Sequence, residues 1–215
     1  ASGGSPWQQG DGINMGLGAG AQLSCMMFPY AFGVGIRLNR EDNSGSLVLA
    51  PGIYVNSDGK RFCFETQEPR ENVVTNIWKQ KNGVAFAIFD QALIDRNASV
   101  FTTLYNADFD QCVEDGYILQ ADTLDELAKL ADIPAANLKE TIEQWNVAVE
   151  KGKDEFGRID GTTTQQSATP PMAMGVAPWY IAQVGACCQD TASGLAITTN
   201  FEVKKATGGT IPRLY

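Results

Sequence analysis

Apolar residues recur at helical spacing between residues 123 and 150, which is the clearest periodic pattern in the chain. Thr123 and Glu126 form the pattern of a capping box, in which each side chain satisfies a free backbone N–H of the other residue. Pro134 suits the first turn of a second helix, where the missing N–H costs nothing. The apolar positions of these two predicted helices are Leu124, Leu127, Ala128, Leu130, Leu138, Ile142, Trp145 and Val149.

Short apolar runs predict strands elsewhere in the chain. Residues 53–56 and 60–64 alternate around Asp58-Gly59, which is a strong signal for a β-hairpin. Residues 84–89 form a compact apolar run that predicts a strand, and a helical turn is expected to follow at Asp90. Further strands are predicted at 180–184, 195–199 and 201–204, with another beginning at Ile211. Because strands and helices are mixed and no internal repeat is present, the pattern predicts an α+β fold.

Two other segments complete the predicted organisation. Residues 71–78 have a helical pattern whose inward positions are Val74, Ile77 and Trp78. Residues 151–177 are rich in Thr, Gln, Pro and Met and are typical of a linker.

A short helix is predicted to begin at Asp11 and Gly12. Within it, residues 16–21 match the spacing of the G-x-G-x-x-[GA] dinucleotide fingerprint. That fingerprint must follow a buried strand, and only polar loop precedes it here, so we reject the match. We interpret the glycines as positions that let this helix pack closely on a sheet.

Composition and charge narrow the possible functions. The 215 residues are 44% hydrophobic and 19% charged, which is ordinary for a globular protein. The net charge of -9 argues against nucleic acid or an anionic membrane surface as a partner, and no apolar stretch has the length of a membrane span. Histidine is absent, which excludes Ser-His-Asp triads and Cys/His zinc sites, and no metal site is predicted. The five cysteines are interpreted as buried or incidental thiols.

Two segments carry a family resemblance. Residues 52–65 read GIYVNSDGKRFCFE, and residues 178–200 contain PWY followed by TASGLAITTN. Together they resemble the flavoprotein subunit of the fumarate reductase and succinate dehydrogenase family. Further similar segments occur in the same order along the chain: QGDGINM with AGA near the start, AIFD at 87–90, TLDELA with IPAANL at 123–138, KDEFGR at 153–158 and GTIPRLY at the end.

The resemblance implies a bacterial flavoprotein fragment that contains parts of two domains. It predicts a capping, or catalytic, domain flanked by the incomplete edge of an FAD-binding α/β domain. The implied boundaries are 1–23 for the edge of the FAD-binding domain, 24–177 for the capping domain and 178–215 for the return into the FAD-binding domain. Since most of the FAD site is missing, the isolated chain is expected to be inactive.

The resemblance also implies a reaction and its proton donor. In this family, reduced FAD passes hydride from N5 to one carbon of a polarised C=C bond, and an acid on the cap protonates the neighbouring carbon. Arg70 is the implied acid, although it stands one residue later than the family pattern. A salt bridge from Arg70 to Glu71 is the structural alternative. Tyr30 is a second candidate acid, as are Tyr54 and Tyr180, and the alternative for each is a buried core residue.

The substrate is expected to be less anionic than fumarate. Phe28 and Asp190 stand where the family's fumarate reducers carry histidines, and an acidic side chain would repel a dicarboxylate. The relay glutamate and arginine of those enzymes are also absent. An aromatic or cationic group is compatible with these residues, and Thr191 is placed beside them as a substrate contact.

The cofactor contacts implied by the resemblance are Asp11, Gly12, Ser193 and Gly194. Asp11 can also serve as a helix N-cap, a role that Asp fills well.

Three functions therefore remain open. The first is an FAD-dependent reductase of an α,β-unsaturated acid or enone, and the second is a flavin dehydrogenase of the ketosteroid type. The third is a ligand-binding module without chemistry of its own. The expected partners are a small-molecule substrate and an electron-donor protein or domain. The compartment, cytoplasmic or periplasmic, is not indicated.

Overall fold

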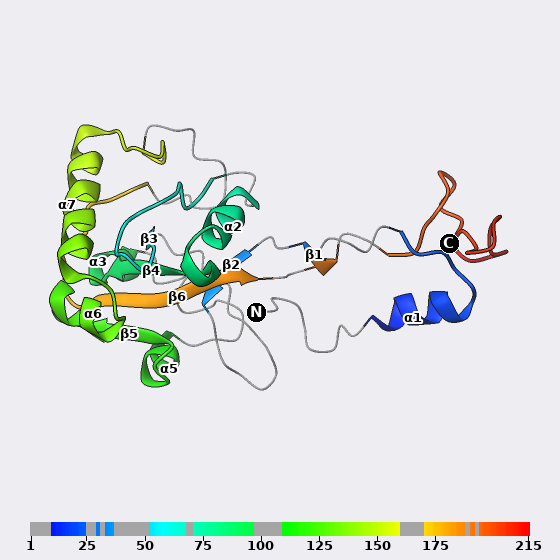
Figure 1. Cartoon of the computed structure of the whole chain (residues 1–215), viewed down its shortest axis with the longest axis horizontal. Helices are drawn as coiled ribbons and strands as arrows, with labels where there is room; N and C mark the ends of the chain where they lie inside the picture. The colour runs from blue at the N-terminus through cyan, green and yellow to red at the C-terminus, as the bar shows by residue number, and fades with distance from the viewer. Residues whose placement is uncertain are drawn as a thin grey trace.

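A computed structural model describes residues 10–24, 29–30, 33–36, 52–67, 71–96, 109–159, 170–187, 190–191 and 194–215. Figure 1 shows these residues as a larger body and a smaller unit at the opposite end of the molecule. The body contains a five-stranded sheet and its helices. The smaller unit, here called the α1 unit, consists of residues 10–24 and 194–215.

The sheet of the body is built around its longest strand, β6 (Trp179–Cys187). β4 (Ala85–Asp90) pairs along one edge of β6, and β3 (Ile53–Val55) pairs with β4 on the outside. The other edge of β6 is shared by β5 (Ile118–Ala121) and β2 (Gly33–Ile36). All of these pairings are antiparallel. Since β6 touches three strands that come from distant parts of the sequence, it is the element that closes the body.

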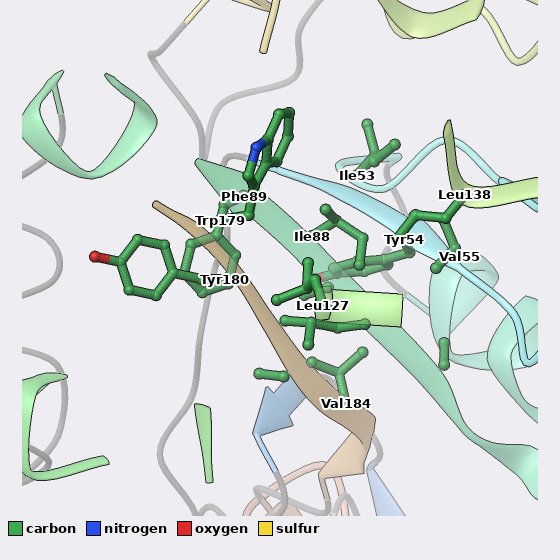
Figure 2. Close-up of a cluster of buried hydrophobic side chains, with 14 of the residues drawn as sticks. Ile53, Tyr54, Val55, Ile88, Phe89, Leu127, Leu138, Trp179, Tyr180 and Val184 are labelled. Atoms are coloured by element: carbon green, nitrogen blue, oxygen red, sulfur yellow. The ribbon is translucent and has the colours of Figure 1, made fainter. Parts of the chain in front are cut away.

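Helices cover the sheet and supply much of the core. They are α2 (Glu71–Trp78), α3 (Gln91–Arg96), α5 (Phe109–Glu114), α6 (Leu124–Leu130) and α7 (Ala135–Lys151), with a short 3₁₀ helix η1 (Lys81–Gly83). Figure 2 shows Leu127 of α6 and Leu138 of α7 in the same apolar cluster as Ile88 and Tyr54 of the sheet. Half of the predicted capping box is confirmed, because the Glu126 N–H donates to Thr123 Oγ1 at 3.2 Å. The Glu126 carboxylate accepts the Thr123 hydroxyl at 2.9 Å instead of the Thr123 N–H.

Part of the segment predicted as a linker is instead held firmly against the body. The buried Asp90 carboxylate accepts the N–H groups of Gly175 and Val176 at 2.8 and 2.9 Å, and also that of Leu93 at the start of α3. The Asn146 side-chain amide pairs with both backbone groups of Met174 at 2.7 and 2.8 Å. The linker interpretation of 151–177 was therefore wrong for its described parts, since side chains distant in sequence satisfy its backbone.

The α1 unit has little regular structure beyond α1 (Asp11–Gly18). A Cβ at Gly16 would lie 2.4 Å from Leu195 Cδ1, so glycine permits the predicted close approach, although Gly18 has open space around it. The strands predicted at 195–199 and 201–204 are reduced to isolated bridges such as Ile197–Val203, and no strand begins at Ile211. Asp11 is the first helical residue and Gly10 is the N-cap, so the N-cap interpretation of Asp11 was wrong.

Several predicted core positions are exposed because they stand at the ends of their elements. Trp78 closes α2 and is 58% exposed, and Leu130 closes α6 and is 54% exposed. The second arm of the hairpin at 60–64 is a single bridge from Arg61 to Val55 rather than a strand. Residues 71–78 and 85–90 otherwise form the predicted helix and strand. No helix in the described ranges has the length and apolar character of a membrane span.

We predict that the body and the α1 unit differ in local stability. The body buries a large apolar core, whereas the buried residues of the α1 unit are Gly16, Ala21 and Val203. Backbone amides in β4 and β6 should therefore exchange with deuterium at least about tenfold more slowly than those of α1, because local opening follows the buried contacts. Hydrogen exchange followed by mass spectrometry measures this difference. Equal protection in both parts would contradict it.

Candidate functional site

A two-stranded junction connects the body with the α1 unit. β1 (Pro29–Tyr30) pairs antiparallel with β7 (Asp190–Thr191), so that Tyr30 is opposite Asp190 and Pro29 is opposite Thr191. Figure 1 shows this pairing between the two parts of the molecule. Three predicted site residues, Tyr30, Asp190 and Thr191, are therefore neighbours in one ladder, although they come from opposite ends of the sequence.

The junction continues into the α1 unit through Gly194. The Ser24 N–H donates to the Gly194 carbonyl oxygen at 2.8 Å, and Leu23 bridges to Leu195. A Cβ at Gly194 would meet nothing within 4 Å, so its backbone has open space beside it. The predicted residues Phe28, Arg70 and Ser193 lie outside the described residues.

The start of α1 suits a polar ligand. Gly10 occupies the N-cap with a left-handed φ of 80° and makes no side-chain cap hydrogen bond to the first N–H groups of the helix. Asp11 is exposed in this turn, and a Cβ at Gly12 would meet nothing within 4 Å. An exposed carboxylate accepts hydrogen bonds from ligand hydroxyl or amine groups, and the adjacent glycine allows close approach. Asp11, Gly12 and Gly194 therefore fit contacts with a bound FAD.

Two of the candidate tyrosines are core residues. Tyr54 is buried in β3, and Tyr180 is buried at the start of β6, where its ring stacks on Phe89 at 5.6 Å. The Tyr180 hydroxyl donates to Gln91 Oε1 at 2.7 Å. Burial, followed by the nearby Asp110 and Asp95 carboxylates, raises the pKa of Tyr180, which makes it a weaker acid. Tyr180 lies seven residues before Cys187, so it is roughly 23 Å along β6 from the end of the strand that leads to the junction.

A buried ion cluster links the hairpin with the segment after α7, and sequence reasoning missed it. The cluster consists of Arg61, Glu65, Asp154 and Arg158. Arg61 binds Glu65 through two hydrogen bonds of 2.6 and 2.9 Å and also donates to Asp154. Arg158 donates to Glu65 Oε2 at 2.9 Å and to the Gly52 carbonyl oxygen at 2.6 Å. Two cations and two anions therefore balance in the interior.

Mutual attraction within the ion cluster outweighs the cost of burial. Burial alone would raise the pKa of Glu65, but Arg158 and Arg61 hold it below its usual range. Burial would likewise raise the pKa of Asp154, but the Ile159 N–H and Arg61 lower it. Burial alone would lower the pKa of Arg61, but the Glu65 and Asp154 carboxylates raise it above its usual value. Arg61, Glu65 and Asp154 therefore stay charged at neutral pH.

Aromatic rings complete the surroundings of the ion cluster. The Arg61 guanidinium lies 4.8 Å from the centre of the Trp145 ring and 5.0 Å from that of Phe156, distances typical of cation–π contacts. A cavity of about 340 Å³ between α7 and the hairpin reaches Arg61. Two sequence features could have pointed to the ion cluster: the Arg-Glu spacing at 61 and 65 and the FGR triplet at 156–158. Nothing in the sequence indicates that these two segments are in contact.

Cys63 and Cys112 are buried. Burial, followed by the Glu65 carboxylate, raises the pKa of the Cys63 thiol, which keeps it protonated. Within the parts of the chain that the structure describes, no group of acidic, cysteine or histidine side chains could hold a metal ion.

Comparison with known proteins identifies the family. A family model described as "FAD binding domain" matches residues 2–215. The chain belongs to this family. It is 30% identical to the NADH:acrylate oxidoreductase of Vibrio harveyi over 218 residues, which covers 98% of this chain and 20% of that protein. The family model confirms FAD as the family's cofactor, and this relative is a bacterial protein that is named as an oxidoreductase.

Two solved structures share the fold. The open conformation of a flavocytochrome c3 fumarate reductase matches with a TM-score of 0.66 and 25% identity, over 96% of this chain and 33% of that one. The 3-ketosteroid Δ1-dehydrogenase of Sterolibacterium denitrificans matches with a TM-score of 0.70 and 25% identity, over 100% of this chain and 41% of that one. These matches confirm the predicted resemblance and a mixed helix and sheet fold of flavoprotein type. The chain spans between a fifth and about two fifths of these relatives.

We predict that Glu65→Gln strongly destabilises the body. The substitution leaves Arg61 and Arg158 buried without their shared carboxylate, which should cost about 3–5 kcal/mol in the free energy of unfolding. Asp125→Asn is a matched control, because the Asp125–Lys139 ion pair is exposed and should contribute about 0–1 kcal/mol. Urea denaturation measures both. A loss from Glu65→Gln no larger than that of the control would contradict the prediction.

The same cluster should make the chain sensitive to acid. Glu65 and Asp154 have lowered pKa values in the folded state, whereas unfolded carboxyl groups titrate near about 4. Their stabilising contribution is therefore complete above about pH 5 and is lost as the pH falls through the lowered folded-state values. The urea midpoint measured from pH 7 to pH 3 should fall on acidification, and less steeply in Glu65→Gln. An identical slope in the two proteins would rule out Glu65 as the sensitive group.

Proposed function

We propose that this chain is the capping domain and adjoining FAD-domain edge of an FAD-dependent oxidoreductase. The proposed reaction is reduction of the C=C bond of an α,β-unsaturated acid or enone other than fumarate. The proposed boundaries are 1–23 and 178–215 for the FAD-domain edge and 24–177 for the cap. A small-molecule substrate and an electron-donor protein or domain are the proposed partners.

The pairing of β1 with β7 carries this proposal. It brings Tyr30, Asp190 and Thr191 into one ladder beside Gly194, at the connection between the body and the α1 unit. A substrate held at such a junction contacts both parts of the protein at once. Closure of the body over it would exclude water and strengthen every electrostatic interaction in the site.

Different residues of the chain take different parts in the proposed reaction. Bound FAD supplies the hydride that adds to one carbon of the double bond. Arg70 is the proposed donor of the proton to the neighbouring carbon, and Tyr30 is the second candidate. Asp11, Gly12, Ser193 and Gly194 are proposed to hold the cofactor. Thr191 and Phe28 are proposed to orient the substrate, the first by hydrogen bonding and the second by apolar contact.

The charge at the junction favours a substrate with one carboxylate or none. The acidic residue Asp190 is paired with Tyr30 in the ladder, and the sequence contains no histidine that could bind a second carboxylate. Acrylate, named for the Vibrio harveyi relative, is an unsaturated monocarboxylate and fits this expectation. We expect the Asp190 carboxylate to repel a dicarboxylate.

A ketosteroid-type dehydrogenase is the second candidate. The TM-score of 0.70 with the 3-ketosteroid Δ1-dehydrogenase supports it, because the two kinds of enzyme share the fold of this fragment. They differ in the proton-transfer group, since the reductase needs Arg70 and the dehydrogenase would depend on a tyrosine such as Tyr30. A ligand-binding module without chemistry is the third possibility, and loss of turnover on substitution of Arg70 or Tyr30 would argue against it.

We predict that the full-length protein reduces acrylate at least about tenfold more efficiently than fumarate. With reduced methyl viologen as electron donor, Asp190→Asn should narrow this difference by about tenfold, because it removes the repelling charge. Arg70→Ala should lower kcat by about 10²–10⁴ while FAD stays bound. Asp125→Asn, on the exposed face of α6, is the control and should leave the rates unchanged.

Four results would count against the proposal. Equal rates with fumarate and acrylate would reject the substrate class. Unchanged turnover in Arg70→Ala would remove Arg70 from the mechanism, and loss of turnover in Tyr30→Phe alone would favour the dehydrogenase. Tight binding of FAD by the 215-residue chain would show that the cofactor site does not need further segments.

A further inference from the structure

The cavity between α7 and the hairpin is separate from the junction. Figure 1 shows α7 at the end of the body that is farther from β1. The cavity has a volume of about 340 Å³, which lies within the range of small-ligand pockets, about 300–1,000 Å³. Its lining comes from residues 60 and 61 of the hairpin, from one face of α7 between 140 and 148, and from residues 154–156. Three segments that are distant in sequence therefore enclose one space.

Arg61 brings unused hydrogen-bond donors to this cavity. A guanidinium group carries five N–H donors. Within the described parts of the chain, Arg61 uses three of them, toward Glu65 and Asp154. Its side chain is only 9% exposed, and the Trp145 and Phe156 rings beside it also line the cavity. An oxygen atom in the cavity is the natural acceptor for the remaining two N–H groups, because buried donors are costly when left unpaired.

Exposed charges of both signs complete the lining. Lys60 and Glu155 are exposed and make no ion pair within the described residues, and Glu140 accepts the Gln144 side-chain amide at 3.1 Å. The cavity therefore offers one further cation and two anions to a ligand. A ligand with carboxylates alone would be repelled by Glu140 and Glu155. A ligand with an amine alone would leave the Arg61 donors without an acceptor.

We propose that this cavity binds a small zwitterionic amino acid. The ligand carboxylate accepts hydrogen bonds from the two remaining N–H groups of Arg61 and from the Lys60 ammonium group. The ligand ammonium group donates to Glu155 and Glu140. The aliphatic side chain of the ligand packs against Phe156 and Ala148. This site is additional to the proposed substrate site, and it does not depend on the proposed reaction.

Calorimetric titration of the full-length protein with L-leucine tests the charge pattern. Two matched analogues accompany it: 4-methylpentanoate, which lacks the ammonium group, and isopentylamine, which lacks the carboxylate. Leucine should bind at one site per chain, at least about tenfold more tightly than either analogue, because each analogue loses hydrogen bonds to charged groups.

Substitutions outside the ion cluster test the place of binding. Lys60→Gln and Glu155→Gln should each weaken leucine binding by about tenfold with an unchanged thermal midpoint, because both side chains are exposed. Ala148→Leu should abolish binding, because the larger side chain occupies the cavity. Lys139→Gln and Glu143→Gln are the matched controls. They remove the same charges from exposed positions of α7 that do not line the cavity, and they should leave binding unchanged.

Four outcomes would overturn the proposal. The first is the absence of saturable leucine binding, and the second is equal affinity for leucine and its two analogues. Unchanged binding in both Lys60→Gln and Glu155→Gln would place leucine elsewhere on the protein. Displacement of leucine by acrylate would place it in the proposed substrate site. Because the readout is binding, failure of the proposed reaction appears separately, as absent turnover with unsaturated acids.

Discussion

The body of this protein depends on a charge balance inside its core. Glu65 is fully buried and accepts hydrogen bonds from Arg61, Arg158 and the Tyr54 N–H, so it joins the hairpin, β3 and the segment after α7 at one point. Each member of the ion cluster is stable only in the presence of the others, because an unpaired charge in the interior is far more costly than the pair. The cluster therefore acts as an all-or-none constraint on how these segments meet.

This constraint extends to the position of the sheet. Arg158 also donates to the carbonyl oxygen of Gly52, directly before β3, and β3 pairs with β4, which pairs with β6. A Cβ at Gly52 would lie 1.9 Å from the Ile88 carbonyl oxygen, so only glycine fits between the hairpin and the sheet. β6 then runs from this fixed core toward β7. β2, the partner of β6, likewise follows β1 in the chain, so two antiparallel strands connect the sheet with the junction.

The contrast between the two parts of the molecule follows from where apolar surface is buried. The body satisfies its polar groups internally, as the contacts of Asp90 and Asn146 with the 174–176 backbone illustrate. The α1 unit relies on backbone hydrogen bonds between Gln22, Ala196 and Lys204 and buries little else. A cofactor-binding edge that is completed by further segments of its domain would have this character.

The features that the sequence determined by itself depend on interactions between residues close together in the chain. The N-cap at Thr123, the apolar face of α7 and, within one residue, the strand predicted at 84–89 depend on neighbouring residues and were predicted correctly. The family motifs likewise predicted FAD and an oxidoreductase family, because each motif is a short continuous stretch of sequence that can be recognised without the tertiary structure. Tertiary structure alone decided the ion cluster and the pairing of Tyr30 with Asp190, because both join residues far apart in the chain. It also decided that Trp78 and Leu130 stay exposed, since burial depends on whether another element covers a helix end.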